Sequence, residues 1–356
     1  MVFKHLDWPL NFGILFLFGA GLLSLASTAP DLFWLQLAWG TLAALIVLFF
    51  SRIDWRPFVN HKNFLLSIYA LSIILLGATY ALAPAVRGVR AWLPIGPFQF
   101  QTSEFAKFAL IIIYSSFFAR GHIGIAHLKN IFVSVLYLIL PIALVVLQPD
   151  MGSALILAGI WFSYLLISGL QWKHIFASLF IFAISLVIMW TSVLRPYQKE
   201  RIIGLFDPER DPLGVNYSVI QSKIAIGSSG FWGKGFGQGT QSQLGFLPEA
   251  QTDFIFAAFI EEWGLLGGVL VLSAFLAVLF RVMKIGMAAD DNFAKLICLG
   301  TAALFLLHFI LNVGSNIGLM PVIGVPFPFL SYGGSNLLVN ALLIGTIQSI
   351  VVHRRF

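Results

Sequence analysis

The sequence predicts an all-α polytopic membrane protein with about ten transmembrane helices. Of the 356 residues, 59% are hydrophobic and only 10% are charged, whereas soluble domains are about 45–50% apolar and about 25% charged. The apolar residues form continuous runs close to the ~20 residues that a helix needs to cross a bilayer. These runs do not alternate between apolar and polar residues, as the strands of a membrane β-barrel would.

The composition also excludes several classes of protein. Too few residues are charged for a soluble enzyme, a nucleic-acid-binding protein or a disordered regulator. Cys298 is the only cysteine, so an intrachain disulfide is impossible. The formal net charge of +6 is typical of cytoplasmic Lys and Arg in a membrane protein and does not indicate a nucleic-acid partner.

The ten predicted spans follow one another along the chain as separate apolar runs. The first could be mistaken for a signal peptide, but its apolar run is long and Pro30 would follow the cleavage point, so we predict a retained helix. The other nine are predicted from continuous apolar sequence between polar connections. In chain order the segments are 11–29, 32–50, 63–83, 103–119, 131–147, 151–168, 174–194, 253–280, 293–315 and 334–352.

The positive charges predict the orientation. With the N-terminus in the cytoplasm, the inside connections are short and rich in Lys and Arg, as the positive-inside rule requires. Both termini are therefore predicted to be cytoplasmic. The inside residues are Lys4, Arg52, Arg56, Lys62, Arg120, Lys129, Lys173, Arg281, Lys284, Lys295, Arg354 and Arg355.

Three irregular segments lie on the opposite, outer side. Residues 84–102 are too polar and Pro-rich to span. Residues 195–252 form a long extracytoplasmic loop between predicted helices 7 and 8, and loops of this length are usually functional. Residues 316–333 are apolar but contain three prolines, which predicts a re-entrant or interfacial loop rather than a spanning helix. We therefore expect the functional site at the outer face of a single membrane domain, residues 1–356.

Six ionisable residues lie within the predicted spans or directly at their ends. Each charge deep in a bilayer costs ~2.5–3.5 kcal/mol on insertion scales, so such residues are candidates for function. Glu104 and Lys107 share a helix face and form either a structural ion pair or part of a substrate cavity. Asp150 either caps the following helix or serves the same cavity. The six are Glu104, Lys107, Asp150, Asp253, Glu261 and Glu262.

Asp253 begins the eighth predicted span, directly after the long loop. An acid at the boundary between water and lipid could act as a base, or it could simply be an acid at a helix start. Glu261 and Glu262 lie about two turns deeper, where a polar tertiary contact is favoured over catalysis. The Lys and Arg residues of the outer loops suit an anionic head group such as a phosphate or diphosphate.

Two motifs can be rejected from their spacing. The stretch 227–235, GSSGFWGKG, suggests a phosphate-binding P-loop, but Ser228 stands where the first glycine is required and Gly235 follows the lysine. The seven His residues have no zinc-ligand spacing.

The remaining motifs, taken in order, resemble the SEDS family (shape, elongation, division and sporulation proteins). Any one of them is weak, but their order along the whole chain is specific. Residues 239–244, GTQSQL, resemble the elongation members more than the division members. The matching stretches are 87–93, 101–107, 148–154, 206–214, 221–227, 233–235, 239–244, 246–257, 261–264 and 324–335.

The resemblance implies a function as well as a ten-helix fold. SEDS proteins polymerise lipid II into glycan strands at the outer face of the cytoplasmic membrane, in support of cell elongation and rod shape. Their essential acid corresponds to Asp253, and their polar cavity includes Glu104 and Lys107. From the other matching stretches we place Asp150, Glu249 and Ser331 in the same cavity. The implied partners are lipid II, the nascent glycan strand, a class B penicillin-binding protein and other membrane proteins of the elongation machinery.

The implied reaction is a single inverting displacement. Asp253 would take the proton from the acceptor 4-hydroxyl, and undecaprenyl diphosphate would leave. Arg90, Arg201, Arg210 and Lys234 are our candidates for stabilising that diphosphate. A divalent cation, Mg²⁺ or Mn²⁺, could assist, although no ligand cluster is evident. The alternative is a lipid II flippase, since buried charges and broken helices also fit a transporter; its polar path should cross both membrane halves.

Overall fold

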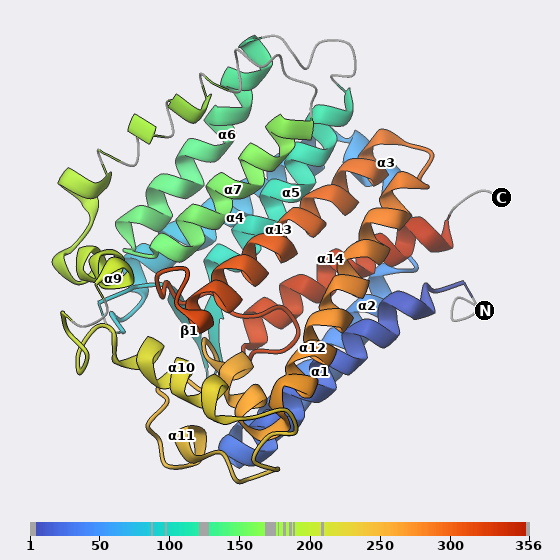
Figure 1. The fold of residues 1–356 in the computed structure, drawn as a ribbon. Helices are drawn as coiled ribbons and strands as arrows, with labels where there is room; N and C mark the ends of the chain where they lie inside the picture. The colour runs from blue at the N-terminus through green and yellow to red at the C-terminus, as the bar shows by residue number, and fades with distance from the viewer. Residues whose placement is uncertain are drawn as a thin grey trace.

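The computed structural model describes residues 5–86, 88–96, 98–120, 128–167, 176, 178–180, 183–184, 187, 189–207 and 210–353. They form a helical bundle with one small hairpin (Figure 1). The helices are α1 Trp8–Thr28, α2 Pro30–Phe50, α3 Arg56–Asn60, α4 Lys62–Leu82, α5 Thr102–Arg120, α6 Leu128–Leu147, α7 Met151–Ile167, α9 Pro196–Phe206, α10 Tyr217–Ser228, α11 Thr240–Gln243, α12 Ile255–Met287, α13 Asn292–Ile317 and α14 Gly334–Val352, with a π-helical turn at Met189–Val193.

The described helices agree with most of the predicted spans and confirm a multi-pass membrane protein. Eight of them (α1, α2, α4, α5, α6, α12, α13 and α14) are long and apolar enough to cross a membrane. Helix α7 corresponds to the sixth predicted span but has only 17 residues. The seventh predicted span, 174–194, is described only in part, and Lys4, Arg87, Lys173, Arg354 and Arg355 lie outside the described residues. The total of ten and the orientation therefore stay predictions.

Helix α5 is the centre of the bundle. It packs against α4, α7, α13 and α14, while α1 pairs with α12 and α2 pairs with α14. Of the residues in the most apolar 18-residue stretch of each helix, 83% are buried in α5 and 11% are buried in α2. Helix α5 is therefore an internal helix that can carry polar groups away from lipid, and α2 is an outer one.

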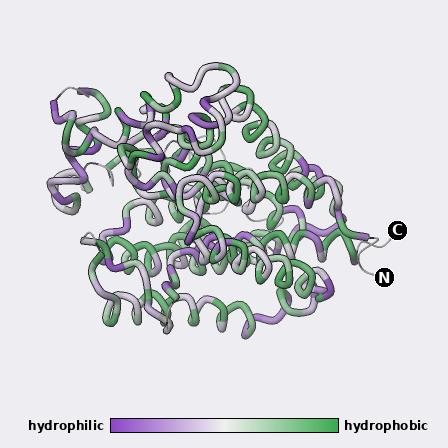
Figure 2. The backbone as a smooth tube through the Cα atoms, turned by 90° about the horizontal axis from the view of Figure 1, so that it is seen from below, coloured by the Kyte–Doolittle hydropathy of each residue, from purple (hydrophilic) through white to green (hydrophobic). Residues whose placement is uncertain are grey.

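The irregular segments gather at the end of the bundle opposite the chain termini. Figure 1 shows both termini at the right and α9, α10, α11 and β1 at the lower left. In Figure 2 hydrophobic colour follows most helices, and hydrophilic colour gathers in the loops at the end away from the termini. We call this the loop end, defined by the hairpin, residues 195–254 and residues 318–333. The predicted clustering of irregular segments on one side is thus confirmed.

Local chemistry explains where several helices begin and end. The Asp7 carboxylate accepts a hydrogen bond from the Leu10 amide at the start of α1, and Asp291 does the same for α13. Gly318 ends α13 in the left-handed conformation, with φ of 77°. The prolines after it keep residues 318–333 free of helix, as the sequence predicts.

The eighth predicted span is not one continuous helix. Helix α12 breaks at Gly264, where φ is 70° and ψ is −174°. Loop 230–235 supplies hydrogen-bond partners to the backbone on both sides of the break. The amides of Lys234 and Gly235 donate to the carbonyls of Glu261 and Glu262, and the amides of Leu265 and Leu266 donate to residues 230 and 231. Backbone groups freed by the break are thus hydrogen-bonded, as a buried site requires.

Segment 84–102, predicted to lie on the outer side, contains a hairpin that the sequence does not predict. Strands β1 (Trp92–Ile95) and β2 (Phe98–Gln101) pair antiparallel, with Trp92 opposite Gln101. The strands are only four residues long, too short for a clear alternating pattern. The hairpin ends directly at Thr102, the first residue of α5, so it fixes how α5 enters the bundle.

Candidate active site

Asp253 lies in a tight turn, half-buried, two residues before α12 begins. The turn is built on Glu249, whose backbone has φ of 52°. The amides of Thr252 and Phe254 both donate to the Glu249 carbonyl at 3.1 Å, and the Thr252 hydroxyl donates to the Glu249 carboxylate at 3.2 Å. Glu249, predicted to line the cavity, therefore shapes the turn that carries Asp253.

Two asparagines of α13 hold the backbone of Asp253. The side-chain amides of Asn312 and Asn316 donate to the Asp253 carbonyl at 3.0 and 2.8 Å. The Asn316 side-chain oxygen also accepts from the Ala257 amide at 3.1 Å, in the first turn of α12. The position of Asp253 thus depends on a helix that follows it in the chain.

Residues 318–333 cover the same turn from the other side. A Cβ atom on Gly324 would lie 3.8 Å from Asp253 Oδ2, and Gly324 has φ of 72°. The Ser331 hydroxyl donates to the Thr252 carbonyl at 2.6 Å and accepts from the Phe327 amide at 2.8 Å. Ser331, predicted for the cavity, is bound to backbone on both sides and holds segment 318–333 against the Asp253 turn.

Tyr332 adds a second connection between these segments. Its amide donates to the Gln251 carbonyl at 2.9 Å. Burial raises the pKa of the Tyr332 phenol above its ordinary value of 10.0, so the hydroxyl stays neutral at physiological pH.

Glu104 and Lys107 form a buried ion pair inside the bundle. Lys107 Nζ lies 2.7 Å from Glu104 Oε1, and both side chains are 1% exposed. Asn336 of α14 donates to the other Glu104 oxygen at 3.1 Å, and His308 of α13 lies 3.4 Å from Lys107 Nζ. The predicted pairing is confirmed. The neighbours Asn336 and His308 complete a polar network that the sequence analysis does not identify.

One face of α13 connects this ion pair to the Asp253 turn. His308, Asn312 and Asn316 are spaced four apart and so lie on one helix face. His308 Nδ1 is 3.2 Å from the Pro326 carbonyl, and Asn312 donates to the Val325 carbonyl at 2.8 Å. Their regular spacing in an otherwise apolar span is the signal that could have predicted them.

Asp150 caps α7 and also contacts the hairpin. Its carboxylate accepts from the Ser153 amide at 3.0 Å, from the Ser103 hydroxyl at 3.3 Å and from the Gln101 side-chain amide at 3.4 Å. The capping role weighed for Asp150 is therefore confirmed. It ties the start of α7 to the junction between hairpin and α5.

The four predicted diphosphate ligands have different surroundings. The Arg90 side chain is exposed. Arg201 donates to the Val322 carbonyl at 2.8 Å. Arg210 lies 3.6 Å from Glu200, on the surface. Lys234 is 2.7 Å from Glu261 Oε1. Arg201, Arg210 and Lys234 lie at the loop end and Arg90 directly precedes its hairpin, but Arg210 and Lys234 already have carboxylate partners.

Glu261 and Glu262 make the tertiary contacts that the sequence favours. Glu261 accepts from Lys234, from the Gln241 amide at 2.8 Å and from the Ser242 amide at 3.0 Å. Glu262 accepts from the Ser27 hydroxyl at the end of α1 and from Gln243 at 3.2 Å. Both acids therefore hold α11 and its neighbouring loop onto the bundle.

A metal-binding cluster is not found in the described part of the chain. Among those residues no group of three His, Cys, Asp or Glu side chains comes together in a way that could hold an ion.

Comparisons with known proteins agree with this architecture. The FtsW/RodA/SpoVE family model, described as cell cycle protein, matches residues 3–356. The peptidoglycan glycosyltransferase MrdB of Escherichia coli (strain K12) is 38% identical over 301 residues, covering 85% of this chain and 79% of MrdB. The peptidoglycan glycosyltransferase RodA of Treponema pallidum (strain Nichols) is 31% identical over 411 residues, covering 96% of this chain and 94% of that protein.

Two solved structures have the same fold. A structure from work on coordination of polymerisation and crosslinking by a peptidoglycan synthase complex superposes with a TM-score of 0.83 at 30% identity, covering 97% of each chain. The rod shape determining protein RodA of Thermus thermophilus superposes with a TM-score of 0.72 at 26% identity, covering 97% of this chain and 96% of that one. The chain belongs to the SEDS family, the FtsW/RodA/SpoVE group of membrane proteins.

Proposed function

We propose that this protein is a peptidoglycan glycosyltransferase that polymerises lipid II into glycan strands at the outer face of the cytoplasmic membrane. The observation that carries the proposal is the 38% identity, over 85% of the chain, to a protein of that name. The geometry adds an acid, Asp253, held at the loop end by α13 and residues 318–333. In this role the protein supports cell elongation and rod shape.

The proposed reaction needs one proton acceptor and one anion stabiliser. The acceptor 4-hydroxyl oxygen attacks the anomeric carbon of the donor, and the bond from that carbon to the diphosphate oxygen breaks. Asp253 accepts the hydroxyl proton, and undecaprenyl diphosphate leaves with the bonding electrons. A positioned base accelerates such a step by about 10²–10⁴-fold. Two asparagine amides on the Asp253 carbonyl support this assignment because they hold the base in place.

The buried polar groups supply the proposed cavity. Glu104 and Lys107 lie within the bundle and reach residues 318–333 through His308. Asp150, Glu249 and Ser331 shape the backbone around the same site. We assign the cavity to the sugars of the substrate, whose hydroxyl groups can bond to charged and amide side chains.

The diphosphate requires cations at the loop end. Arg90 and Arg201 are the best placed of the four candidates, because Arg210 and Lys234 are paired with Glu200 and Glu261. A divalent cation, Mg²⁺ or Mn²⁺, would assist at the diphosphate through the phosphate oxygens of the substrate, and we assign it no ligand among the described residues. Polymerisation with EDTA, then with either ion restored, tests that assignment.

The test of the function is glycan polymerisation from lipid II by the purified protein. We expect long strands from the wild type and none from Asp253→Asn. The matched control is Asp31→Asn, which changes an exposed acid at the start of α2, and it should polymerise like the wild type. Thermal unfolding of each variant checks that the fold is retained.

Two other outcomes would contradict the proposed function or the role of Asp253. If the wild type makes no polymer under any condition but carries lipid II across liposome membranes, the protein is a flippase and Asp253 is a transport or structural acid. Polymer from Asp253→Asn at the wild-type rate would refute its assignment as the base.

We propose a class B penicillin-binding protein as the main partner, in the inner membrane with other proteins of the elongation machinery. Support comes from the similarity to a chain in a peptidoglycan synthase complex that coordinates polymerisation and crosslinking. Polymerisation measured with and without such a transpeptidase shows whether the partner raises the rate.

A further inference from the structure

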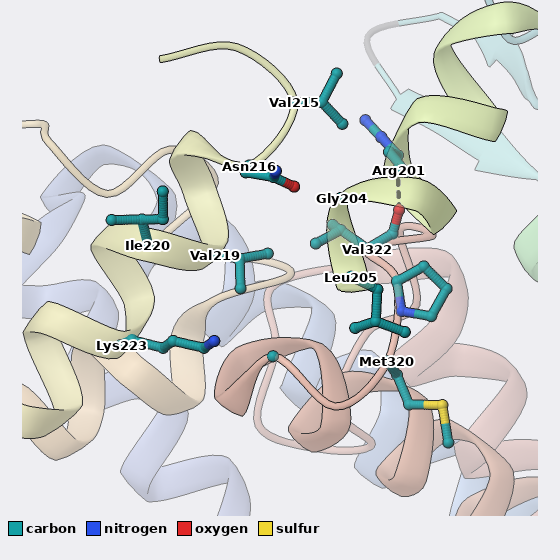
Figure 3. A pocket seen from close by; sticks show the side chains of 12 residues that line it. Arg201, Gly204, Leu205, Val215, Asn216, Val219, Ile220, Lys223, Met320 and Val322 are labelled. Carbon is teal, nitrogen blue, oxygen red and sulfur yellow. Dashed lines mark hydrogen bonds between the residues drawn. The ribbon is translucent and has the colours of Figure 1, made fainter. Parts of the chain in front are cut away.

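A pocket at the loop end lies between α9, α10 and residues 318–322 (Figure 3). Its empty space is about 410 Å³ when the open mouth is included, and only a small part of that space is enclosed. Arg201 lines one wall and Lys223 another, with apolar side chains between them. Lys223 is not among the four cations that the sequence analysis selects.

Arg201 is held in place with hydrogen-bonding capacity to spare. Its guanidinium donates to the Val322 carbonyl at 2.8 Å, shown as the dashed line in Figure 3. It also lies 5.8 Å from the centre of the Tyr197 ring. A guanidinium has five N–H donors, and this is its one hydrogen bond to the residues that the structure describes. Donors remain that can bind an anion at the mouth of the pocket.

Lys223 enters the pocket from the opposite wall. Figure 3 shows its side chain extending from α10 toward residues 318–322, and its outer atoms lie against Gly318. Across the described ranges, neither Lys223 nor Arg201 has a carboxylate within 4.0 Å. This distinguishes them from Lys234 and Arg210, whose charges are already compensated by Glu261 and Glu200.

The rest of the lining favours a ligand that is anionic at one end and apolar along its length. Leu205, Val219 and Met320 contribute apolar surface beside the two cations. Phosphate groups are bound by such pairs of Arg and Lys through charge-assisted hydrogen bonds, while burying apolar surface favours a hydrocarbon chain.

The pocket shares a wall with the Asp253 site. Val322, which binds Arg201, also packs against the cluster formed by Phe254 and its neighbours. Gly324, two residues further along, is the residue beside the Asp253 carboxylate. An anion in the pocket would therefore lie against the same short segment, 318–324, that faces the proposed base.

We propose that this pocket binds the diphosphate of an isoprenoid-linked substrate or product, with Arg201 and Lys223 as its two cationic ligands. The proposal rests on the proposed function for the identity of the ligand. A purely structural role is the competing explanation for Lys223, since a cation beside the C-terminus of α13 also stabilises that helix.

The experiment measures binding rather than turnover. The purified full chain in detergent micelles is titrated with undecaprenyl diphosphate and, separately, with inorganic pyrophosphate. We expect Arg201→Gln and Lys223→Met each to weaken binding of the lipid diphosphate about tenfold, as loss of one charged hydrogen bond implies. The matched control is Lys199→Gln, a cation on α9 outside the pocket lining, which should bind like the wild type.

The two probes separate the sources of the anion. Weaker binding of both probes by the pocket variants assigns the site to the diphosphate itself. Weaker binding of the lipid alone means that the apolar wall is also required, and both results support the pocket. Unchanged affinity for both probes in Arg201→Gln and Lys223→Met overturns it, and a lower melting temperature for Lys223→Met would then identify the helix-end role.

The Asp253→Asn variant separates this inference from the proposed function. We expect it to bind undecaprenyl diphosphate with wild-type affinity although it makes no polymer. If the wild type itself makes no polymer, the function fails, yet loss of binding in the two pocket variants would still support the diphosphate site.

Discussion

At the scale of single residues, the side chains that position Asp253 are amides. Asn312 and Asn316 both donate to its carbonyl, and Asn316 also bonds to the Ala257 amide. A buried side-chain amide that hydrogen-bonds to two backbone groups is costly to replace, because each backbone group left without a hydrogen bond lowers the free energy of unfolding by about 1–3 kcal/mol. We regard Asn316 as a positioning residue: it acts through Asp253 and need not touch the substrate.

Replacing Asn316 by Leu should slow turnover more than it weakens binding. We expect kcat for polymerisation to fall at least tenfold with KM little changed, because the base is displaced while the cavity persists. Thermal stability should also fall, by about 1–3 kcal/mol. Asn11→Leu is the control, since Asn11 is hydrogen-bonded to Gln348 near the termini and should affect stability without slowing turnover. Equal kcat values for both variants would contradict the positioning role.

The Glu104–Lys107 ion pair either stabilises the fold or lines the substrate cavity. Removing one partner of a buried ion pair leaves an unpaired charge and costs about 3–5 kcal/mol. We therefore expect Glu104→Gln and Lys107→Met each to lower the melting temperature strongly, and the double variant to lower it less than either single one. Melting curves of the three variants in micelles test this.

Polymerisation by the double variant then decides the role of the pair. Loss of activity in a well-folded double variant would place the pair in the substrate cavity. Retained activity would mean that the pair serves to hold α5 against α13 and α14.

At the scale of elements, the break in α12 determines the shape of the loop end. Gly264 allows the chain to turn sharply after Trp263, and loop 230–235 supplies the missing hydrogen bonds. A Cβ atom at Gly264 would collide with backbone atoms of residues 231–233. The side chains of Glu261 and Glu262 are directed by this turn toward α11 and α1.

We expect Gly264→Ala to destabilise the protein by more than about 2 kcal/mol. The backbone of Gly264, with φ of 70° and ψ of −174°, lies in a region that is essentially restricted to glycine and costs other residues about 1–3 kcal/mol, and the collision adds to that cost. Gly77→Ala is the matched control: Gly77 lies within α4, and nothing is within 4 Å of its added Cβ. Alanine should stabilise that helix by about 0.5–1 kcal/mol. Thermal unfolding of the two variants measures both effects, and equal melting temperatures would refute the explanation of the break.

At the scale of the whole molecule, the separation of the termini from the loop end gives the protein its direction in the membrane. The predicted orientation places the termini inside and the pocket, hairpin and Asp253 turn outside. The one cysteine, Cys298, is completely buried, so the native chain is a clean background for labelling.

Single introduced cysteines test the orientation. Leu213, 86% exposed in the long loop, should react as Leu213→Cys with a membrane-impermeant maleimide on intact cells. Arg52→Cys, between α2 and α3, should react only after the membrane is permeabilised, and the native chain should not react. The reverse pattern would place the loop end in the cytoplasm and exclude an outer-face site.

Much of the architecture follows from local sequence. In lipid, a continuous apolar run must satisfy its backbone hydrogen bonds within the run, and an α-helix does so. The predicted spans therefore agree with the described helices to within a few residues, except at the C-terminal end of α12. The Glu104–Lys107 pair is likewise local, because residues three apart share a face. The hairpin and the α12 break were missed because short strands and single glycines carry weak local signals.

By itself, the sequence determined the membrane class, most of the spans, the family and the candidate acids, since these depend on composition, run length and motif order. Only the tertiary structure decided which groups meet. It brought Asn316 to Asp253, 63 positions away, and His308 to Lys107, 201 positions away. It also distinguished Arg210 and Lys234, which are paired with carboxylates, from Arg201 and Lys223, which line the pocket. Such partners are chosen by the packing of helices distant in the chain, which local patterns do not encode.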